Sequence, residues 1–292
     1  MIKKGNNYTK SYPEVISFVD SNFPHAIVDE FGNWFAESNP FFAPNRKDLS
    51  NDIAFVFSTD KNYYPGLVVA LRSLLELHDN IPIIIIERDL SEMQKRYLTQ
   101  FAQIIPARRF IPEHVAWDRF DISFLKYKRI VFLDCDIVIL NPLNDFINSK
   151  SDFSAVKNLN WTVKENFKTS SALVKYGIPF EKPAFFAGGF SINNEVWGNG
   201  RLFYEASELF YSEWNEFIYG DQSALQIIMY RNNSKIEYLD ETNNALAECW
   251  DWKNRRNDAK VIHYTGELKP WHKGSNQLEE KYFFKYSKIV NE

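Results

Sequence analysis

Apolar positions from residue 53 onward recur first at the spacing of strands and then at the spacing of helices. The runs Ile53–Phe57 and Ile81–Glu87 are almost wholly apolar, which predicts two buried strands. Between them, the leucines of Pro65–His78 recur at helical spacing, which predicts a helix packed against the strands. A serine and a glutamine then form a capping box, so we expect the next helix to cover Glu92–Gln103.

The same alternation continues up to a pair of aspartates. We expect a helix over Trp117–Leu125 and a strand over Arg129–Leu133. Strands that alternate with helices are typical of a parallel sheet covered on both faces. Ligands bind beyond the carboxyl ends of the strands in such sheets. The pattern therefore predicts a nucleotide-type site near Ser58–Tyr63 and Asp134–Asp136.

The second half of the chain mixes strands and helices less regularly. The expected strands are Ala184–Asn193 and Ala259–Tyr264, and the expected helices are Asn194–Trp214, Asp221–Tyr230 and Gln277–Ile289. We therefore predict one α/β domain over residues 52–292, with a central mixed, mainly parallel sheet. Residues 1–51 hold scattered prolines and aromatic residues without a long periodic segment, which indicates an amino-terminal extension packed on that domain.

Composition excludes several classes of protein. The net charge of −4 and the absence of long basic runs argue against nucleic-acid binding. No apolar run is long enough to span a bilayer, and the first residues lack the apolar stretch of a secretory signal. Only two cysteines are present, which fits a reducing compartment, so we expect a cytoplasmic protein. The basic and aromatic segment Lys281–Lys288 allows at most peripheral contact with a membrane, and a packed closing helix explains it better.

Two aspartates and a later histidine are the sharpest chemical signals. Asp134 and Asp136 are two residues apart at a strand end, so their side chains point to the same side. The pair either holds a cation or consists of ordinary strand-end residues, and the spacing alone does not decide between these readings. His263 follows another apolar strand, and Lys269 stands beside a proline and a tryptophan. A histidine and a lysine in this setting suit a metal–diphosphate complex.

Five segments, taken in order, resemble glycosyltransferase family eight, the group of glycogenin and the bacterial lipopolysaccharide α-galactosyl- and glucosyltransferases. They are Phe57–Tyr63, Arg119–Ile122, Leu133–Asp136, Gly220–Gln222 and His263–Trp271. The resemblance covers about residues 53–289 and implies a GT-A fold. It also implies transfer of a hexose from UDP-glucose or UDP-galactose with retention of configuration, forming an α-linkage. The implied cation is Mn²⁺, with Mg²⁺ as the second choice, and the implied acceptor is a glycan, a lipopolysaccharide or another molecule.

The resemblance also assigns roles to individual residues. Asp134, Asp136 and His263 resemble the metal ligands. The uridine pocket is implied at Thr59, Asp60, Asn62 and Tyr63, although Asp60 and Asn62 could instead cap the following helix. Further donor contacts are implied at Cys135, Ala187, Gly188, Gly266 and Lys269, of which Gly266 and Lys269 resemble diphosphate contacts. Asp221 and Gln222 resemble the residues beside the anomeric carbon, and Arg119 resembles the basic residue near the donor sugar.

The sequence departs from the family pattern at two points, and two alternative functions have to be considered. Ala187 stands where the family has an asparagine, and the interval from Arg119 to Asp134 is two residues shorter, which puts the reach of Arg119 in question. The alanine motivates the alternative of a non-catalytic, nucleotide-sugar-binding relative. The segment Phe132–Val138 also fits a haloacid-dehalogenase-like phosphatase with an aspartyl nucleophile and Mg²⁺. That function needs a later acidic pair, and Asp221 supplies only one carboxylate.

Overall fold

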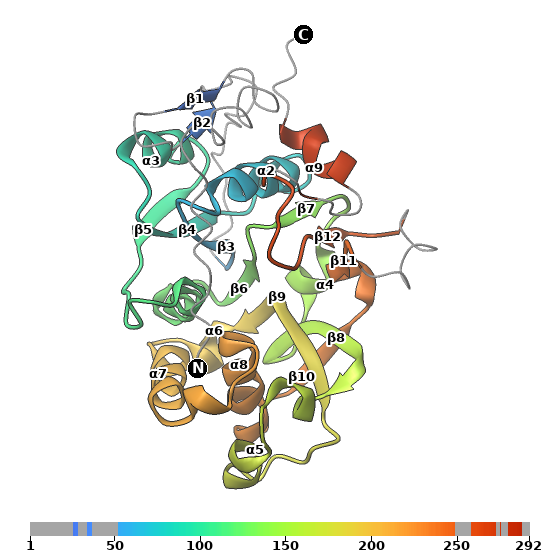
Figure 1. Cartoon of the computed structure of the whole chain (residues 1–292). Coiled ribbons are helices and arrows are strands. Elements are labelled where there is room, and N and C mark those ends of the chain that lie inside the picture. Colours follow the sequence, from blue (N-terminus) through green and yellow to red (C-terminus); the bar gives the residue numbers. More distant parts are fainter. Residues whose placement is uncertain are drawn as a thin grey trace.

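A seven-stranded sheet forms the centre of the computed structural model (Figure 1), which describes residues 26–28, 34–36, 52–248, 258–272, 275 and 280–287. The strands run in the order β10-β8-β9-β6-β3-β4-β5. Their bounds are β3 Ile53–Asp60, β4 Ile83–Arg88, β5 Gln103–Pro106, β6 Arg129–Leu133, β8 Phe153–Thr162, β9 Pro183–Asn193 and β10 Ile236–Leu239. Only β9 runs antiparallel to its neighbours in this sheet, β6 and β8. The predicted mixed, mainly parallel sheet is confirmed.

Both faces of the sheet are covered, which explains why the inner strands β3 and β4 are buried along almost their whole length. Phe55 and Phe57 of β3 point into one core with helix α2 (Tyr64–Leu75) and with α9 (Glu280–Ser287). Ala54 and Val56 point into the other core, where the 3-10 helix η2 (Val115–Phe124), α7 (Arg201–Glu213) and α8 (Gly220–Arg231) pack.

A second, smaller sheet contains the strand that follows Asp134 and Asp136 in the chain. It has the order β11-β12-β7, with β7 Ile137–Ile139, β11 Ala245–Leu246 and β12 Val261–His263. β12 pairs with β7 antiparallel, so that His263 lies opposite Ile137. This pairing brings a residue from near the end of the chain beside the aspartates that follow β6.

Short helices connect the strands. They are α3 Glu92–Leu98, α4 Asn144–Asn148, α5 Ser171–Lys175, α6 Asn194–Trp197 and the 3-10 turns η3 Val163–Asn166, η4 Trp214–Glu216 and η5 Glu241–Asn244. The capping box expected at the start of α3 is present. None of the helices in the described ranges combines the length and apolarity that crossing a bilayer requires.

Several expected bounds were wrong. The helix expected over Glu92–Gln103 ends at Leu98, and Gln103 instead begins the edge strand β5 beside β4. The single helix expected over Asn194–Trp214 is split into α6 and α7, because Gly200 takes a left-handed conformation with φ 81° between them. The segment expected as a helix over Trp117–Leu125 is a 3-10 helix. The closing helix is described only as α9, and the rest of Gln277–Ile289 lies outside the described residues.

Within the expected extension, residues 1–51, the structure describes one antiparallel pair of strands. β1 (Ala26–Val28) pairs with β2 (Trp34–Ala36), and β2 lies against α3. The other residues of this segment lie outside the described part, so the predicted domain boundary at residue 52 stays a prediction.

Candidate active site

Three potential metal ligands converge at the carboxyl end of β6. Asp134 and Asp136 follow that strand directly, and His263 ends β12. One ligand atom from each of these residues lies within 4.8 Å of the other two. The imidazole Nε2 is 3.1 Å from Asp136 Oδ1 and 3.9 Å from Asp134 Oδ2. The predicted trio is therefore assembled in space, with two carboxylates and one imidazole facing a common point.

The orientation of His263 is held by a residue that no motif suggested. Asn244, at the end of η5, is buried, and its Oδ1 lies 2.9 Å from His263 Nδ1. An amide oxygen can only accept, so Nδ1 donates the hydrogen bond, and Nε2 is directed at the carboxylates. Gly188 packs against the same ring, where a Cβ would overlap the imidazole. The site thus requires glycine at position 188.

Lys269 supplies a buried positive charge next to the aspartates. Its Nζ donates to Asp136 Oδ2 at 2.6 Å and to the carbonyl oxygen of Tyr264 at 2.9 Å. Burial acts to raise the pKa of Asp136, but Lys269 and His263 outweigh it and hold that pKa below its ordinary value. Burial raises the pKa of Asp134 to about 6, with Arg119 opposing and Asp136 reinforcing the shift. The surroundings therefore shift the pKa values of the two carboxylates in opposite directions.

Arg119 links the aspartate pair to the residues expected beside the anomeric carbon. Its guanidinium lies 3.0 Å from Asp134 Oδ1 and 2.9 Å from Asp221 Oδ2, and it donates to the carbonyl oxygen of Ala187 at 2.7 Å. Arg119 therefore reaches Asp134 although the interval between these two residues is two residues shorter than in the family. Burial raises the pKa of Asp221, against the effect of Arg119. One cation thus joins Asp134 and Asp221.

The alanine that departs from the family pattern contributes through its backbone. The N–H of Ala187 donates to Gln222 Oε1 at 3.1 Å, while Gln222 Nε2 donates to Asn166 Oδ1 at 2.9 Å. The carbonyl of the same residue receives Arg119. The peptide of Ala187 therefore fixes two side chains of the site without any help from its own side chain.

The loop after β3 carries the residues expected around uridine. Asp60 Oδ1 accepts hydrogen bonds from the backbone N–H groups of Asn62 and Tyr63 at 2.9 and 3.0 Å. Asp60 therefore shapes the turn before α2, but no side chain caps this helix, so the alternative in which Asp60 and Asn62 cap it is wrong. Thr59 is buried next to Asp60. Tyr63 is 38% exposed, and Lys269 Nζ lies 5.9 Å from the centre of its ring. The tyrosine thus presents an accessible ring near the buried lysine.

Cys135 lies between the two aspartates, but its side chain faces the sheet. Its Sγ donates to the carbonyl oxygen of Ser58 at 3.2 Å. Burial raises the pKa of the Cys135 thiol. The thiol is therefore part of the packing between β3 and β6.

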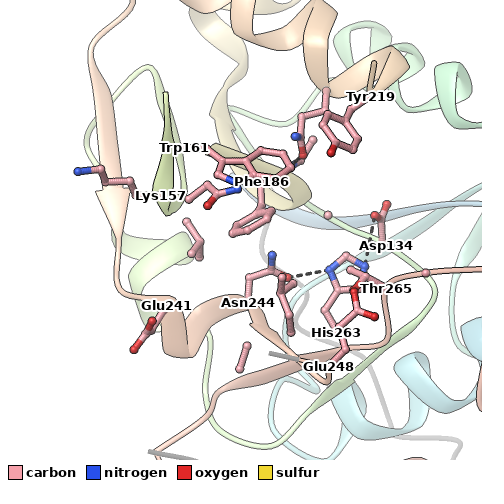
Figure 2. Close-up of a pocket in the computed structure, with 18 of the residues that line it drawn as sticks. Asp134, Lys157, Trp161, Phe186, Tyr219, Glu241, Asn244, Glu248, His263 and Thr265 are labelled. Carbon is pink, nitrogen blue, oxygen red and sulfur yellow. Dashed lines mark hydrogen bonds and ion pairs between the residues drawn. The ribbon is translucent and has the colours of Figure 1, made fainter. Parts of the chain in front are cut away.

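A pocket of about 630 Å³ opens beside these groups (Figure 2). Of the expected residues, it is lined by Arg119, Asp134, Ala187, Gly188, Asp221, Gln222, His263 and Gly266. The expected residues that do not line it are Thr59, Asp60, Asn62, Tyr63, Cys135, Asp136 and Lys269. Sequence reasoning missed several lining residues, including Asn158, Asn160, Trp161, Phe186, Tyr219 and Asn244. Apart from the enrichment in aromatic residues, no signal in the sequence indicated them.

The chain is similar to known proteins over much of its length. Residues 111–275 match the family model described as Glycosyl transferase family 8. A lipopolysaccharide 1,2-glucosyltransferase of Escherichia coli is 24% identical, over 82% of this chain and 79% of that protein. The enzyme with that name in strain K12 is 22% identical, over 90% of this chain and 83% of its own length.

Solved structures share the fold at low sequence identity. The galactosyltransferase LgtC, determined in complex with donor and acceptor sugar analogs, superposes with a TM-score of 0.62 at 19% identity, covering 80% of this chain and 95% of that chain. The glycosyltransferase GlyE of Streptococcus pneumoniae gives 0.60 at 19% identity, covering 81% and 61%. The central sheet and its helices therefore form a GT-A fold.

Proposed function

Because the chain belongs to glycosyl transferase family 8, we propose that it moves a hexose from a UDP-sugar to an acceptor hydroxyl with retention of configuration. The observation that carries this proposal is the convergence of Asp134, Asp136 and His263 with Lys269 beside the pocket. Membership in this family leaves the phosphatase interpretation without support, and in the described structure Asp134 is paired with Arg119 rather than free to act as a nucleophile.

The three converging residues fit a divalent cation, and we propose Mn²⁺. Carboxylate oxygens with one imidazole nitrogen suit Mn²⁺ better than Mg²⁺, which prefers an all-oxygen environment. Gly188 leaves room for the His263 ring, whose Nε2 lies 3.1 Å from Asp136 Oδ1. When bound, the cation would neutralise charge that grows on the diphosphate leaving group.

Lys269 and Tyr63 are proposed to act on the UDP part of the donor during the transfer. In the transfer, the bond from the anomeric carbon to the β-phosphate oxygen breaks and its electron pair stays on UDP. The acceptor oxygen bonds to that carbon from the same face, and its proton passes to the departing phosphate oxygen. Lys269 is the buried cation suited to stabilise the negative charge that develops there. The Tyr63 ring, near that lysine, is proposed to stack on uracil.

Arg119, Asp221 and Gln222 are proposed to act on the sugar side of that bond. Arg119 holds Asp221 by an ion pair, and the Ala187 peptide holds Gln222. Asp221 and Gln222 are therefore held in place at the pocket wall, where they can position sugar hydroxyl groups. Since the backbone of Ala187 still holds Arg119 and Gln222, the catalytic proposal is favoured over a non-catalytic relative.

The first experiment measures UDP release from a panel of UDP-sugars with Mn²⁺, with and without EDTA. Slow hydrolysis of the donor requires no knowledge of the acceptor. We expect release from UDP-glucose or UDP-galactose that is lost with EDTA and in Asp136→Ala. Asp89→Ala is the matched control, because Asp89 pairs with Arg109 at an exposed position. Absence of both UDP binding and UDP release would refute the proposed site.

The names of the curated relatives support a setting in lipopolysaccharide or polysaccharide assembly. We propose that the protein works on the cytoplasmic side, with at most peripheral contact to the membrane. Fractionation of the producing cells and washing of membranes at high salt would test this placement.

A further inference from the structure

Asn166 is buried beside the turn that carries Asp221 and Gln222, although it does not line the pocket. It ends the 3-10 turn η3, and its backbone carbonyl accepts from the N–H of Ile218 at 3.0 Å and from Ser223 Oγ at 2.8 Å. Ser223 belongs to the first turn of α8. The backbone of Asn166 therefore already holds this turn in place, and its side chain is available for another role.

The side chain of Asn166 contacts the amide of Gln222, whose orientation is determined by its partners. The backbone N–H of Ala187 can only donate, so the Gln222 atom 3.1 Å from it is the oxygen Oε1. The other atom of the amide is then the nitrogen Nε2, which donates to Asn166 Oδ1 at 2.9 Å. The two contacts thus select one of the two orientations of the amide. Neither contact uses the second N–H of Nε2, which is left for a ligand in the pocket that Gln222 lines.

The asparagine at this position is not explained by the stability of the fold alone. Asn166 is fully buried, and its Nδ2 has no hydrogen-bond partner among the described residues. A buried amide nitrogen without a partner destabilises a folded protein, and an apolar side chain of similar size would avoid this cost. Within the described part of the chain, the bond from Gln222 is the hydrogen bond that the side chain of Asn166 makes. The acceptor oxygen is therefore the useful part of this side chain.

We propose that Asn166 is a positioning residue for the transfer, which holds the amide of Gln222 in the orientation that acts on the donor sugar. Gln222 is the residue proposed to act beside the anomeric carbon, so this inference rests on the proposed transferase function. Without the oxygen of Asn166, only the N–H of Ala187 would hold the amide, which could then rotate about its side-chain bonds. A displacement of about 1 Å at a reacting centre can lower a rate by about 100-fold.

The test is a double-mutant cycle in the full chain, measured as UDP release with Mn²⁺ from the UDP-sugar that the wild type hydrolyses. Asn166→Leu and Asn166→Ala both remove the acceptor oxygen but differ in size, whereas Asn166→Asp keeps an oxygen towards Gln222. Each change is also made in the Gln222→Ala background, and urea unfolding checks that each variant is folded. Asn194→Leu is the matched control, because Asn194 is also buried, donates to the carbonyl oxygen of Leu125 at 2.6 Å and has an Oδ1 without a partner among the described residues.

We expect Asn166→Leu and Asn166→Ala to lower kcat for UDP release by about 10–100-fold, while the Kd for UDP with Mn²⁺ stays unchanged. Asn166→Asp retains more of the rate than either variant, and Asn194→Leu keeps the wild-type rate. In the Gln222→Ala background the changes at Asn166 have no further effect, because the residue through which they act is gone. An equal loss in that background, or a wild-type kcat in folded Asn166→Leu and Asn166→Ala, would overturn the positioning role. A wild type that releases no UDP from any donor would instead refute the proposed function.

Discussion

Asn244 illustrates how a single residue outside every motif can shape this site. Its amide oxygen lies 2.9 Å from Nδ1 of His263, and the contact is buried. Hydrogen bonds of this kind hold a ligating histidine in one tautomer and orientation. The metal-binding capacity of His263 therefore depends on Asn244 as well as on the two aspartates.

Asn244→Ala is expected to weaken Mn²⁺ binding by about 10–100-fold, because the histidine loses its orienting partner. Titration of the protein with Mn²⁺, followed by calorimetry or by electron paramagnetic resonance, measures this directly. Asn243→Ala is the matched control, since Asn243 is also buried in η5 but bonds Asp145 and Asp240 instead. Equal Mn²⁺ affinity in both variants would remove the role assigned to Asn244.

Asp221→Asn is expected to reduce transfer by roughly two orders of magnitude or more, in the range found for well-placed groups at a reacting centre. The isosteric amide removes the charge that pairs with Arg119 at 2.9 Å but leaves the size of the side chain unchanged. UDP affinity, measured by calorimetry with Mn²⁺, should survive the change. Unchanged turnover would exclude the role of Asp221 beside the anomeric carbon.

At the scale of elements, η2 combines a site residue with a buried acid. It carries Arg119 and, two positions later, Asp121, whose side chain accepts from the backbone N–H of Arg108 at 2.7 Å. The other carboxylate oxygen is buried without a hydrogen-bond partner among the described residues. Burial raises the pKa of Asp121 to about 6. Asp121 is therefore a structural residue, and its negative charge is unfavourable in the folded state.

Because burial raises the pKa of Asp121, its contribution to the stability of the fold should fall as the pH rises. A carboxyl whose folded pKa lies above its unfolded value contributes stability below about pH 4, and this contribution is lost as the pH rises through 6. Asp121→Asn should therefore gain about 1–3 kcal/mol in the free energy of unfolding at pH 7.5, with little change at pH 4. Urea unfolding at several pH values tests this, with the exposed Asp89→Asn as control. A loss of stability at pH 7.5 would contradict it.

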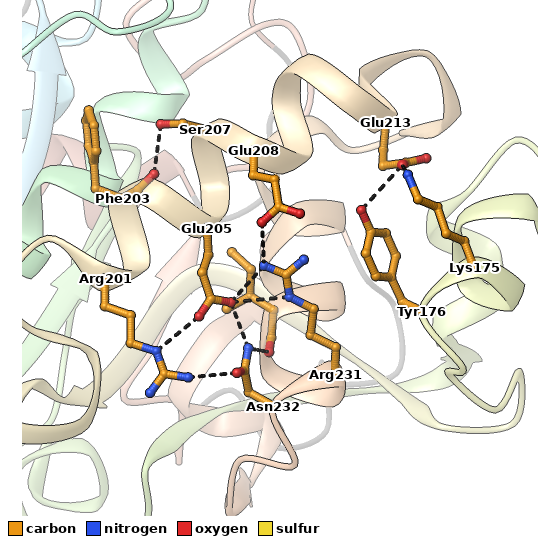
Figure 3. A network of polar contacts seen from close by, with 11 residues as sticks. Lys175, Tyr176, Arg201, Phe203, Glu205, Ser207, Glu208, Glu213, Arg231 and Asn232 are labelled. Carbon is orange, nitrogen blue, oxygen red and sulfur yellow. Dashed lines mark hydrogen bonds and ion pairs between the residues drawn. The ribbon is translucent and has the colours of Figure 1, made fainter.

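At the scale of the whole molecule, a polar network joins the two helices on the far side of the sheet from α2 (Figure 3). Glu205 of α7 accepts from Arg231 at 2.9 Å, from Asn232 at 2.7 Å and from Arg201 at 3.0 Å. The side chains of Glu205 and Arg231 are each 16% exposed. This network stabilises the layer that carries α8, the helix whose first turn holds Asp221.

Glu205→Ala is expected to lower the free energy of unfolding by about 1–3 kcal/mol, because it leaves Arg231 partly buried without its main partner. Urea unfolding measures the loss. Glu208→Ala is the matched control, since Glu208 is 60% exposed and its contact with Arg231 is longer, at 3.3 Å, so its removal should matter little. Donor hydrolysis of the folded Glu205→Ala protein should equal that of the wild type. A drop in hydrolysis at full folding would show that the network also positions the site.

Much of this architecture follows from local patterns in the sequence. Arg129–Leu133 was recognisable as a strand because its apolar, β-favouring residues suit a strand buried on both faces of a sheet, and Ala184–Asn193 was recognisable although two glycines interrupt it. The order of motifs indicated which residues should meet at the strand ends. Short strands such as β5 and β7 were not predicted, because three or four residues carry too little periodicity to distinguish a strand from a turn.

The sequence by itself determined the α/β class, the family resemblance and the identity of the metal and phosphate candidates, because these rest on local spacing and on residue chemistry. Only the tertiary structure decided that Arg119 reaches both Asp134 and Asp221, that Asn244 orients His263, and that Trp161 faces Tyr219. Each of these contacts joins side chains from different elements. Their distances depend on how the whole sheet and its helices pack, and no local pattern along the chain encodes them.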